Sequence, residues 1–280
     1  MAYFSASFEK GITVHAFQTG TVAVKKPHYQ FNGPDFLKLP SILLSWRWTM
    51  PLPIWVWLVE TPFGKYLIDT GESTHFYQKD HFSNSSENYV NRKILKIDIQ
   101  ERQQIDAQLV SIGLSPNDID AVIYTHLHID HTDGMGFFPN AEHLVHQAEL
   151  AKPFGVAFST FPKWFKPKKI QHQNTSLPFA GSYSIDPCIE LVSTPGHTWG
   201  HQSVIIHTQN YDIFLAGDTT FNESQLLQNE VGGINIDTAL SKTTLKNIQL
   251  YCRERRVLYL PSHDQESGKR LSKQVITLSV

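Results

Sequence analysis

Residues 125–134 read Thr125-His126-Leu127-His128-Ile129-Asp130-His131-Thr132-Asp133-Gly134, directly after the apolar run at 121–124. Neutral imidazole is the commonest metal ligand in proteins, and a carboxylate is its usual hard partner. Because side chains at positions i and i+2 of a strand point to the same side, we expect His126 and His128 to converge on one point. The chain then leaves strand geometry, so Asp130 and His131 can face a neighbouring point. The segment therefore predicts ligands for two adjacent metal ions, against the alternative of a histidine-rich surface loop without ligands.

Three later segments also place a ligand-type side chain directly after an apolar, strand-like run. His197 follows the run at 191–193, Asp218 follows the run at 213–216, and His263 follows the run at 257–260. In layered α/β proteins, strand ends meet at one edge of a sheet, where ligand sites are usually built. Five His and two Asp at such ends make a site for two metal ions chemically sensible.

The composition restricts the class of protein and its partners. The chain has 280 residues, of which 41% are hydrophobic and 18% are charged, and its net charge is −2. Such a balance provides no basic field for nucleic acid or an anionic membrane surface, so neither is expected as a partner. Cys188 and Cys252 stand singly, as reduced thiols of a cytoplasmic protein do, although pairing between them stays open. Residues 1–20 lack a signal-peptide pattern, and the apolar run at 54–59 is too short to cross a bilayer.

Local patterns predict one domain spanning residues 1–280, with strands early and late and helices between them. The clearest signal is a hairpin, with strands at 54–60 and 65–69 around Thr61-Pro62-Phe63-Gly64. We expect residues 25–48 to be irregular and residues 152–170 to form an aromatic loop. The pattern favours two sheets with helices outside them. Further strands are expected at 12–17, 189–193, 203–207, 211–216 and 257–260, helices at 101–113, 223–228 and 238–251, and a strand followed by a short helix at 141–151.

The combined pattern resembles the metallo-β-lactamase superfamily. The sequence His-x-His-x-Asp-His at 126–131 is followed by His197, Asp218 and His263 in the order of that superfamily, and the match extends from Asp69 to His263. Within the superfamily, the segment 194–203 is most similar to the N-acyl-homoserine lactonases. The resemblance implies an α+β fold, a four-layer αβ/βα sandwich with the metals at one edge.

The resemblance also implies a ligand set and a reaction. Asp218 would bridge two divalent ions together with a hydroxide; zinc is expected, and manganese, iron or cobalt also suit the mixed donors. Two cations sharing a hydroxide provide a nucleophile at neutral pH, and Asp130 would pass a proton to the leaving group. The expected reaction is attack of this hydroxide on the carbonyl of a small ester, most simply the opening of a lactone ring. One ion would be held by His126, His128 and His197, and the other by Asp130, His131 and His263.

One position departs from the lactonase pattern. The homoserine lactonases usually carry a Tyr three residues after the bridging Asp, and its hydroxyl assists the lactone carbonyl. The corresponding residue here is Phe221. A phenyl ring can pack against a substrate, but it cannot donate a hydrogen bond.

Other residues are expected to act around the metals. Asp69 is a candidate acceptor for the free N–H of a ligand imidazole, with a turn cap before Gly71 as the equal alternative. We expect His201 to support the loop around His197, and Asp133 to belong to the turn at Gly134. Trp48, Met50 and the cluster at 154–165, which includes Trp164, are candidates to line a hydrophobic substrate channel together with Phe221. The alternative for these aromatic residues is core packing or a homodimer contact, since relatives commonly form homodimers.

Several other functions remain as alternatives. A phosphoester or organophosphate hydrolase comes second, because the same pair of metals stabilises displacement at phosphorus, and a glyoxalase-II-type thioesterase comes third. The bridging Asp argues against a penicillin-hydrolysing enzyme, and the lack of a basic recognition tract argues against a nuclease. Iron-loaded redox relatives usually replace one motif His with Glu, whereas His128 is intact here. A scaffold protein without metal is disfavoured because all seven ligand positions are filled.

Overall fold

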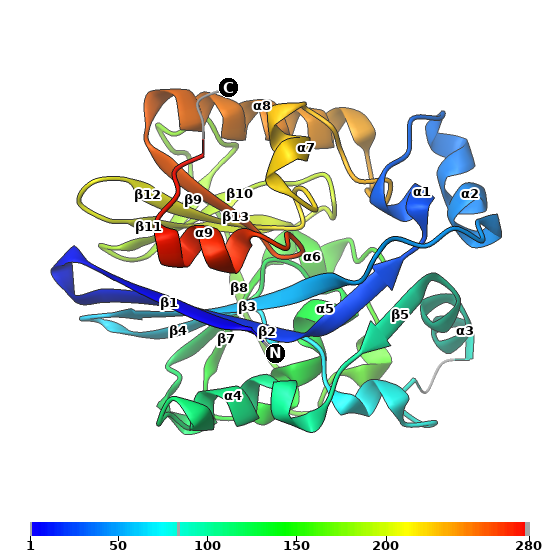
Figure 1. Cartoon of the computed structure of the whole chain (residues 1–280), viewed down its shortest axis with the longest axis horizontal. Coiled ribbons are helices and arrows are strands. Elements are labelled where there is room, and N and C mark those ends of the chain that lie inside the picture. The colour runs from blue at the N-terminus through cyan, green and yellow to red at the C-terminus, as the bar shows by residue number, and fades with distance from the viewer. Residues whose placement is uncertain (1, 83–84, 278–280) are drawn as a thin grey trace.

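A computed structural model describes residues 2–82 and 85–277 of the chain. Two β-sheets lie face to face at the centre of the molecule, with helices on their outer faces (Figure 1). The larger sheet has the order β1-β2-β3-β4-β6-β7-β8, with β5 paired to β2. Its strands are β1 (Tyr3–Phe8), β2 (Ile12–Val24), β3 (Leu52–Thr61), β4 (Gly64–Ile68), β5 (Leu95–Asp98), β6 (Ala121–Ile123), β7 (Glu142–His146) and β8 (Lys168–Ile170).

The second sheet has the order β13-β12-β11-β10-β9. Its strands are β9 (Ser182–Asp186), β10 (Ile189–Ser193), β11 (Gln202–His207), β12 (Asp212–Gly217) and β13 (Val257–Pro261). The helices of the described residues are α1 (Lys26–Tyr29), α2 (Lys38–Leu44), α3 (Ser85–Ile94), α4 (Ile105–Ser111), α5 (Ile129–Thr132), α6 (Gln147–Ala151), α7 (Glu223–Leu227), α8 (Thr238–Glu254) and α9 (Ser267–Lys273).

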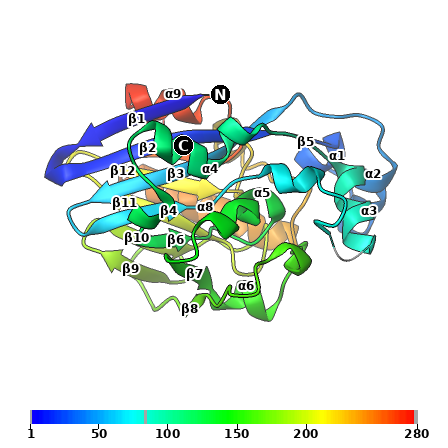
Figure 2. The ribbon, with the colours of Figure 1, turned by 90° about the horizontal axis from the view of Figure 1, so that it is seen from below.

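Three apolar layers hold the sheets and helices together. Between the sheets, side chains such as Trp57 and Leu215 meet in one buried cluster. Outside the larger sheet, α4 buries Ile105 and Leu109, and outside the second sheet, α8 packs residues including Ile248 against the strands. Turning the molecule shows the strands of the two sheets stacked between these helices (Figure 2). This arrangement is the αβ/βα sandwich that the resemblance implies.

The strand predictions agree with the structure more closely than the helix predictions. The hairpin is confirmed as β3 and β4, and the segment 141–151 forms β7 and α6. The continuous helix expected at 101–113 is wrong, because Gln104 has an extended backbone between a short 3-10 turn and α4. The sequence predicted an irregular segment at 25–48, but the structure places α1 and α2 there. The predicted strand at 12–17 continues to Val24, with a register shift at Gly20, where φ is +85°.

The topology directs several strand ends toward one place. β4 and β6 are parallel neighbours in the larger sheet, and β12 and β13 are parallel neighbours in the second sheet. The segments that follow these four strands carry Asp69, His126, Asp218 and His263 respectively. The sandwich therefore brings these side chains to one edge.

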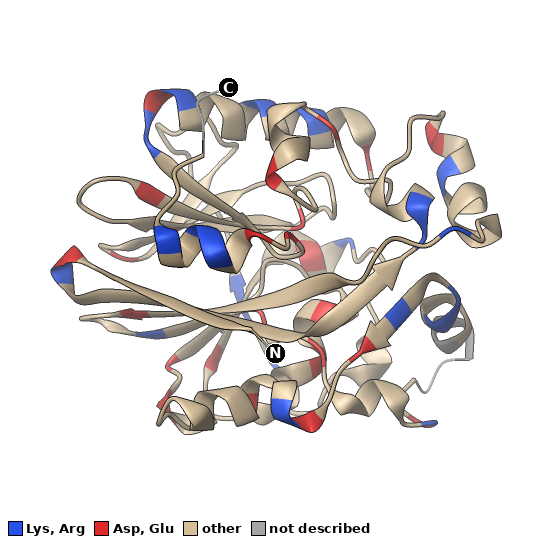
Figure 3. Ribbon diagram, in the orientation of Figure 1, with Lys and Arg blue, Asp and Glu red and all other residues tan. Residues whose placement is uncertain are grey.

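Charged residues are mostly kept away from the central strands, which are largely tan in Figure 3. Lys and Arg alternate with Asp and Glu along the outer helices and loops, so both signs are present on the flanks of the sandwich. Across residues 2–82 and 85–277, no helix combines the length and apolar composition needed to cross a lipid bilayer.

Candidate metal centre

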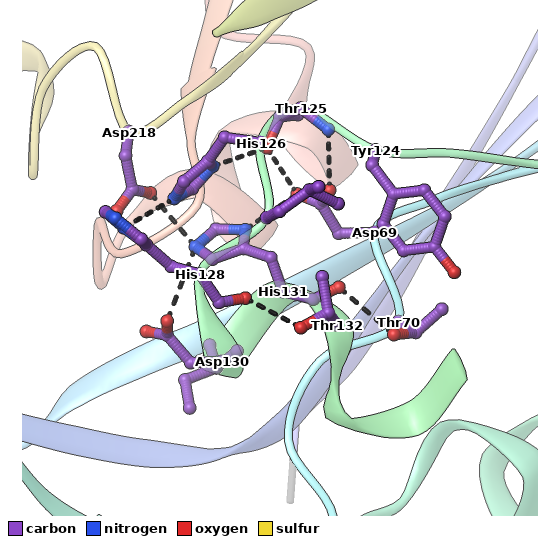
Figure 4. Close-up of polar contacts among 12 residues, drawn as sticks. Asp69, Thr70, Tyr124, Thr125, His126, His128, Asp130, His131, Thr132 and Asp218 are labelled. Atoms are coloured by element: carbon purple, nitrogen blue, oxygen red, sulfur yellow. Dashed lines mark hydrogen bonds and ion pairs between the residues drawn. The ribbon is translucent and has the colours of Figure 1, made fainter. Parts of the chain in front are cut away.

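The structure brings all seven predicted ligands together at the edge of the sandwich (Figure 4 shows five of them by name). Within each of three groups, the candidate ligand atoms lie within 4.8 Å of one another. Two groups match the two ligand sets expected from the resemblance, and the third joins members of both sets to Asp218. The groups are His126, His128 and His197; Asp130, His131 and His263; and His126, His131 and Asp218.

Asp218 lies between the two ligand sets. Its Oδ1 is 3.4 Å from His131 Nε2, and its Oδ2 is 3.3 Å from His263 Nε2. The same Oδ2 lies 3.6 Å from His197 Nε2, which belongs to the other set. One carboxylate therefore reaches both sets, as a bridging ligand must.

Each of the five imidazoles has one nitrogen in the cluster and the other held by an oxygen atom. Metal-bound histidines are usually oriented in this way, because the outer N–H then fixes the tautomer and leaves the inner nitrogen free to bind. The outer contacts are His126 Nδ1 to Thr125 Oγ1 at 3.0 Å, His128 Nε2 to the Phe154 carbonyl at 2.9 Å, His131 Nδ1 to Asp69 Oδ2 at 2.8 Å, His197 Nδ1 to the Ile234 carbonyl at 3.0 Å, and His263 Nδ1 to the Pro53 carbonyl at 2.9 Å.

The inner nitrogens are crowded in a way that suits a cation. His126 Nε2 and His197 Nε2 lie 3.0 and 2.9 Å from His128 Nδ1, so three imidazole lone pairs face one another when the outer nitrogens carry the protons. In the other set, His131 Nε2 and Asp218 Oδ1 are buried without a hydrogen-bond partner. Buried polar atoms of this kind are costly without a partner, and divalent metals would satisfy them.

Burial and neighbouring charges shift the pKa values of the histidines differently in the two ligand sets. Burial and the adjacent imidazoles hold the pKa of His126 and His197 well below the usual range. Burial also opposes the charged form of His131, yet the carboxylates of Asp218, Asp69 and Asp130 together raise its pKa well above the usual range. The histidine set is therefore neutral, and the second set combines imidazoles with carboxylates.

Asp69 orients one ligand from the end of β4. Its Oδ2 accepts the Nδ1–H of His131 at 2.8 Å and the Thr125 hydroxyl at 2.8 Å, while its Oδ1 accepts the Thr125 N–H. The residue is 1% exposed, and its φ is +60°, a left-handed conformation that Asp tolerates better than most residues. The side chain thus contacts the ligand loop rather than capping the turn at Gly71.

His201 contacts two parts of the candidate site. The Asp218 backbone N–H donates to His201 Nε2 at 3.0 Å, so the proton is on Nδ1, which lies 2.9 Å from Thr194 Oγ1. A Cβ at Gly217 would lie 2.6 Å from His201 Nε2, and the φ of Gly217 is +57°. The imidazole therefore holds the backbone under Asp218 and also contacts Thr194, at the start of the loop that carries His197.

Asp133 begins the short 3-10 turn Asp133–Phe137, which includes Gly134, and its side chain is also buried in polar contacts. It is 8% exposed, and its Oδ2 accepts both the backbone N–H and the hydroxyl of Ser73, at 3.1 and 2.5 Å. His81 Nε2 lies 2.8 Å from its Oδ1. The carboxylate is part of a buried polar network behind the ligand loop, which its neighbour Gly134 did not indicate.

Glu149 is a supporting residue that the sequence did not indicate. From α6 it accepts the N–H of Leu127, the hydroxyl of Thr198 and the N–H of Gly200, at 3.1, 2.7 and 3.0 Å. A Cβ at Gly200 would lie 2.2 Å from the Glu149 backbone nitrogen, so glycine is required for this approach. One buried carboxylate thus joins the loop of His126 and His128 to the loop of His197.

A cavity of about 220 Å³ opens onto the cluster of candidate ligands. Its floor includes His128, Asp130, His197, Asp218 and His263. Its walls are mainly apolar, and they come from β2, α2, α3, β5 and several loops: Val22, Val24, Leu39, Val90, Ile94, Leu95, Ile129, Phe154, Phe221 and Ile234.

Phe221 and Phe154, the latter from the cluster predicted at 154–165, line this cavity, whereas Trp48, Met50 and Trp164 do not. Phe221 is buried in its wall. Trp48 and Met50 line a separate surface hollow, where Trp48 packs between the ammonium groups of Lys25 and Lys96. Trp164 stacks near His143, with 5.4 Å between ring centroids, and does not reach the cavity. These three positions are corrected because the sequence could not show which way the aromatic loops fold.

Comparison with known proteins gives a consistent result. The model of the metallo-beta-lactamase superfamily matches residues 49–263. An N-acyl homoserine lactonase from a Bacillus species is 28% identical over 230 residues, which cover 81% of this chain and 88% of the relative. The N-acyl homoserine lactonase AttM of Rhizobium radiobacter is 25% identical over 281 residues, covering 94% of this chain and 97% of the relative.

Solved structures share the fold at lower identity. An N-acyl homoserine lactone hydrolase with the product N-hexanoyl-L-homoserine bound at its catalytic metal center superposes with a TM-score of 0.73 at 22% identity, covering 91% of this chain and 94% of that one. A hydrolase named AbOPH, of the beta lactamase superfamily, gives 0.64 at 18% identity, covering 95% and 91%. The family match spans most of the chain and includes all seven clustered ligands. The chain belongs to the metallo-β-lactamase superfamily and is a metal-dependent hydrolase.

Proposed function

We propose that this hydrolase opens the ring of lactones that carry an apolar acyl chain, with N-acyl homoserine lactones as the first candidates. The observation that carries the proposal is the cavity, whose apolar walls lead directly to the clustered ligands. An ester group can lie over the cluster while an acyl chain fills the space between Val24, Leu39 and Ile94. The names of the relatives support the same substrate class.

The proposed site holds two divalent metal ions, with zinc expected, in the two ligand sets joined by Asp218. Such a pair supplies a hydroxide at neutral pH and polarises an ester carbonyl. The chain itself positions the ester and excludes water through the apolar walls. Asp130 is partly exposed to the cavity, and its Oδ2 lies 3.4 Å from His263 Nε2. We assign it the transfer of a proton to the oxygen that leaves when the ring C–O bond breaks.

The test compares substrates on the same preparations, loaded with zinc or with manganese. Hydrolysis of a short-chain and a long-chain homoserine lactone is measured beside an aryl phosphotriester. We expect lactone opening with a preference for the longer chain, lost on chelation and in His128→Ala. Turnover confined to the phosphotriester would instead assign the protein to the organophosphate hydrolases, an alternative that the missing hydroxyl at Phe221 favours. A glyoxalase-II-type thioester serves as the third substrate.

We further propose a homodimer that works in the cytoplasm. Apolar side chains on and beside α2 are exposed, including Phe36, Leu44, Trp46 and Met50 at 77, 81, 78 and 74%. Patches of this kind commonly mark protein contacts, and a second copy is the proposed partner. The two thiols, at Cys188 and Cys252, are buried and unpaired, which suits a reducing compartment.

A further inference from the structure

His28 lines the cavity but belongs to none of the motifs that predict the site. It is on the short helix α1, and its side chain lines the same cavity as His128, Asp130 and Asp218. The residue is 8% exposed. No motif in the sequence indicated it, because residues 25–48 were expected to be irregular.

The backbone around His28 is firmly held. Its carbonyl accepts the N–H groups of Gly233 and Ile234, at 2.8 and 3.1 Å. A Cβ at Gly233 would lie 1.7 Å from the Pro27 carbonyl oxygen, so only glycine permits this approach. The Ile234 carbonyl in turn accepts the Nδ1–H of His197 at 3.0 Å. The position of His28 is thus fixed relative to a candidate metal ligand.

The imidazole of His28 has a polar atom without a partner. Its Nδ1 is buried and has no hydrogen-bond partner among the described residues. Buried polar atoms are rarely left in this state, because a missing hydrogen bond costs about 1–3 kcal/mol. Burial lowers the pKa of His28 to about 4, so the ring is neutral and offers one N–H donor. Because His28 lines the cavity, a ligand there can accept the single N–H of this imidazole.

The described residues around His28 in the cavity wall offer no other buried side chain that can donate a hydrogen bond to a ligand. The ring lies at the edge of Phe221, with 6.1 Å between centroids and 66° between planes, and Phe221 in turn lies 5.7 Å from His263. Outside the metal cluster, the other polar side chain in the cavity lining is Asn91, which is less buried. Phe221 cannot donate a hydrogen bond, so His28 is the buried group that can.

We propose that His28 donates a hydrogen bond to the substrate carbonyl oxygen that becomes negatively charged when hydroxide adds to the carbonyl carbon. This inference rests on the proposed ester hydrolysis. The imidazole stays neutral and transfers no proton; it stabilises the charge on an oxygen that the apolar walls shield from water. A fixed donor aimed at such an oxygen typically contributes about 10²- to 10³-fold to kcat.

The test compares His28→Leu with His28→Asn, two side chains of similar shape of which only Asn donates. We expect kcat for lactones to fall about 100-fold in His28→Leu and less than about 10-fold in His28→Asn, with KM little changed. Both variants should keep the metal content of the parent protein, measured by elemental analysis. The exposed Asp80→Asn, outside the cavity lining, is the control and should leave kcat within about threefold. Adding Phe221→Tyr to His28→Leu should restore part of kcat.

Several outcomes would overturn the proposal. Equal kcat in the Leu and Asn variants would show that no donated hydrogen bond is involved. A lower melting temperature in His28→Leu would assign the ring to the fold, since removal of an unpartnered polar group should leave stability unchanged or raised. If His28→Leu raised only KM, and only for substrates with an amide, His28 would contact the acyl amide and not the lactone carbonyl. An alkyl γ-lactone without an amide distinguishes these two contacts. Absence of any lactone turnover in the parent protein would instead reject the proposed function.

Discussion

At the scale of single residues, Asp218 is the group on which the two-ion assignment depends. Its carboxylate oxygens lie within 3.6 Å of imidazole nitrogens from both sets. We expect Asp218→Ala to reduce metal content from two ions toward one, and kcat/KM by at least about 100-fold. Elemental analysis beside lactone kinetics checks this, with the exposed Asp80→Asn as the control. Unchanged metal stoichiometry would contradict a bridging role.

Asp69 acts through His131 and not on the substrate. In Asp69→Asn the side chain keeps its size but loses its charge. One carboxylate oxygen becomes an NH2 group, which cannot accept the hydrogen bonds that Thr125 or His131 donates. Substitutions of this type usually weaken metal binding by about 10- to 100-fold. Competition with a chelator measures the affinity, and excess metal should recover most of the activity. Activity that stays low under saturating metal would mean that Asp69 does more than orient a ligand.

At the scale of elements, the second sheet contains a partly buried group of charged side chains away from the candidate metal ligands. On β11, His207 places Nδ1 2.9 Å from Asp212 Oδ1 of β12 and Nε2 3.3 Å from Glu190 Oε2 of β10. Hydrogen bonds that the ring donates to Asp212 and Glu190 raise the pKa of His207 from 6.5 to about 9. Because the pKa of His207 is higher in the folded state than in the unfolded state, its charged form stabilises the fold. This contribution to the free energy of unfolding is complete below about pH 6.5 and is lost as the pH rises through about 9.

We therefore expect His207→Gln to reduce the free energy of unfolding by about 2 kcal/mol at about pH 6 and by little at about pH 10. Urea unfolding of the variant and the parent protein at both pH values measures the difference. An equal loss at both values would mean that the ring contributes by packing and not by charge.

Elements also show where sequence reasoning succeeds. The strands were predictable because apolar alternation and turn residues are local signals, as in the hairpin of β3 and β4. The ligands were predictable because each follows such a strand, and parallel strand ends converge. The prediction of a continuous helix at 101–113 was wrong because the spacing of the apolar residues does not indicate the extended backbone of Gln104. Glu149 and His28 were missed because their roles depend on partners 20 to 200 residues away, which no local pattern encodes.

At the scale of the whole molecule, α2 projects from one end of the sandwich (Figures 1 and 2). Leu39 and Leu44 of this helix are exposed, whereas Ile42 is buried. We expect light scattering after size exclusion to give about twice the chain mass of 31.9 kDa. Leu44→Lys combined with Trp46→Lys should yield monomers that keep their metals, because both side chains lie outside the cavity lining. Leu250→Lys on α8 is the control, since Leu250 is also exposed. A parent protein that elutes as a monomer would contradict the proposed homodimer.

The two unpaired cysteines give this chain a practical property. Burial raises the pKa of Cys188 and raises the pKa of Cys252 to about 12, so neither thiol is readily available to alkylating reagents. A cysteine introduced at Leu39, which is 55% exposed and lies at the mouth of the cavity, would be the reactive thiol of the protein. A fluorophore or spin label attached there would report when the cavity fills, without any need to remove the native cysteines first.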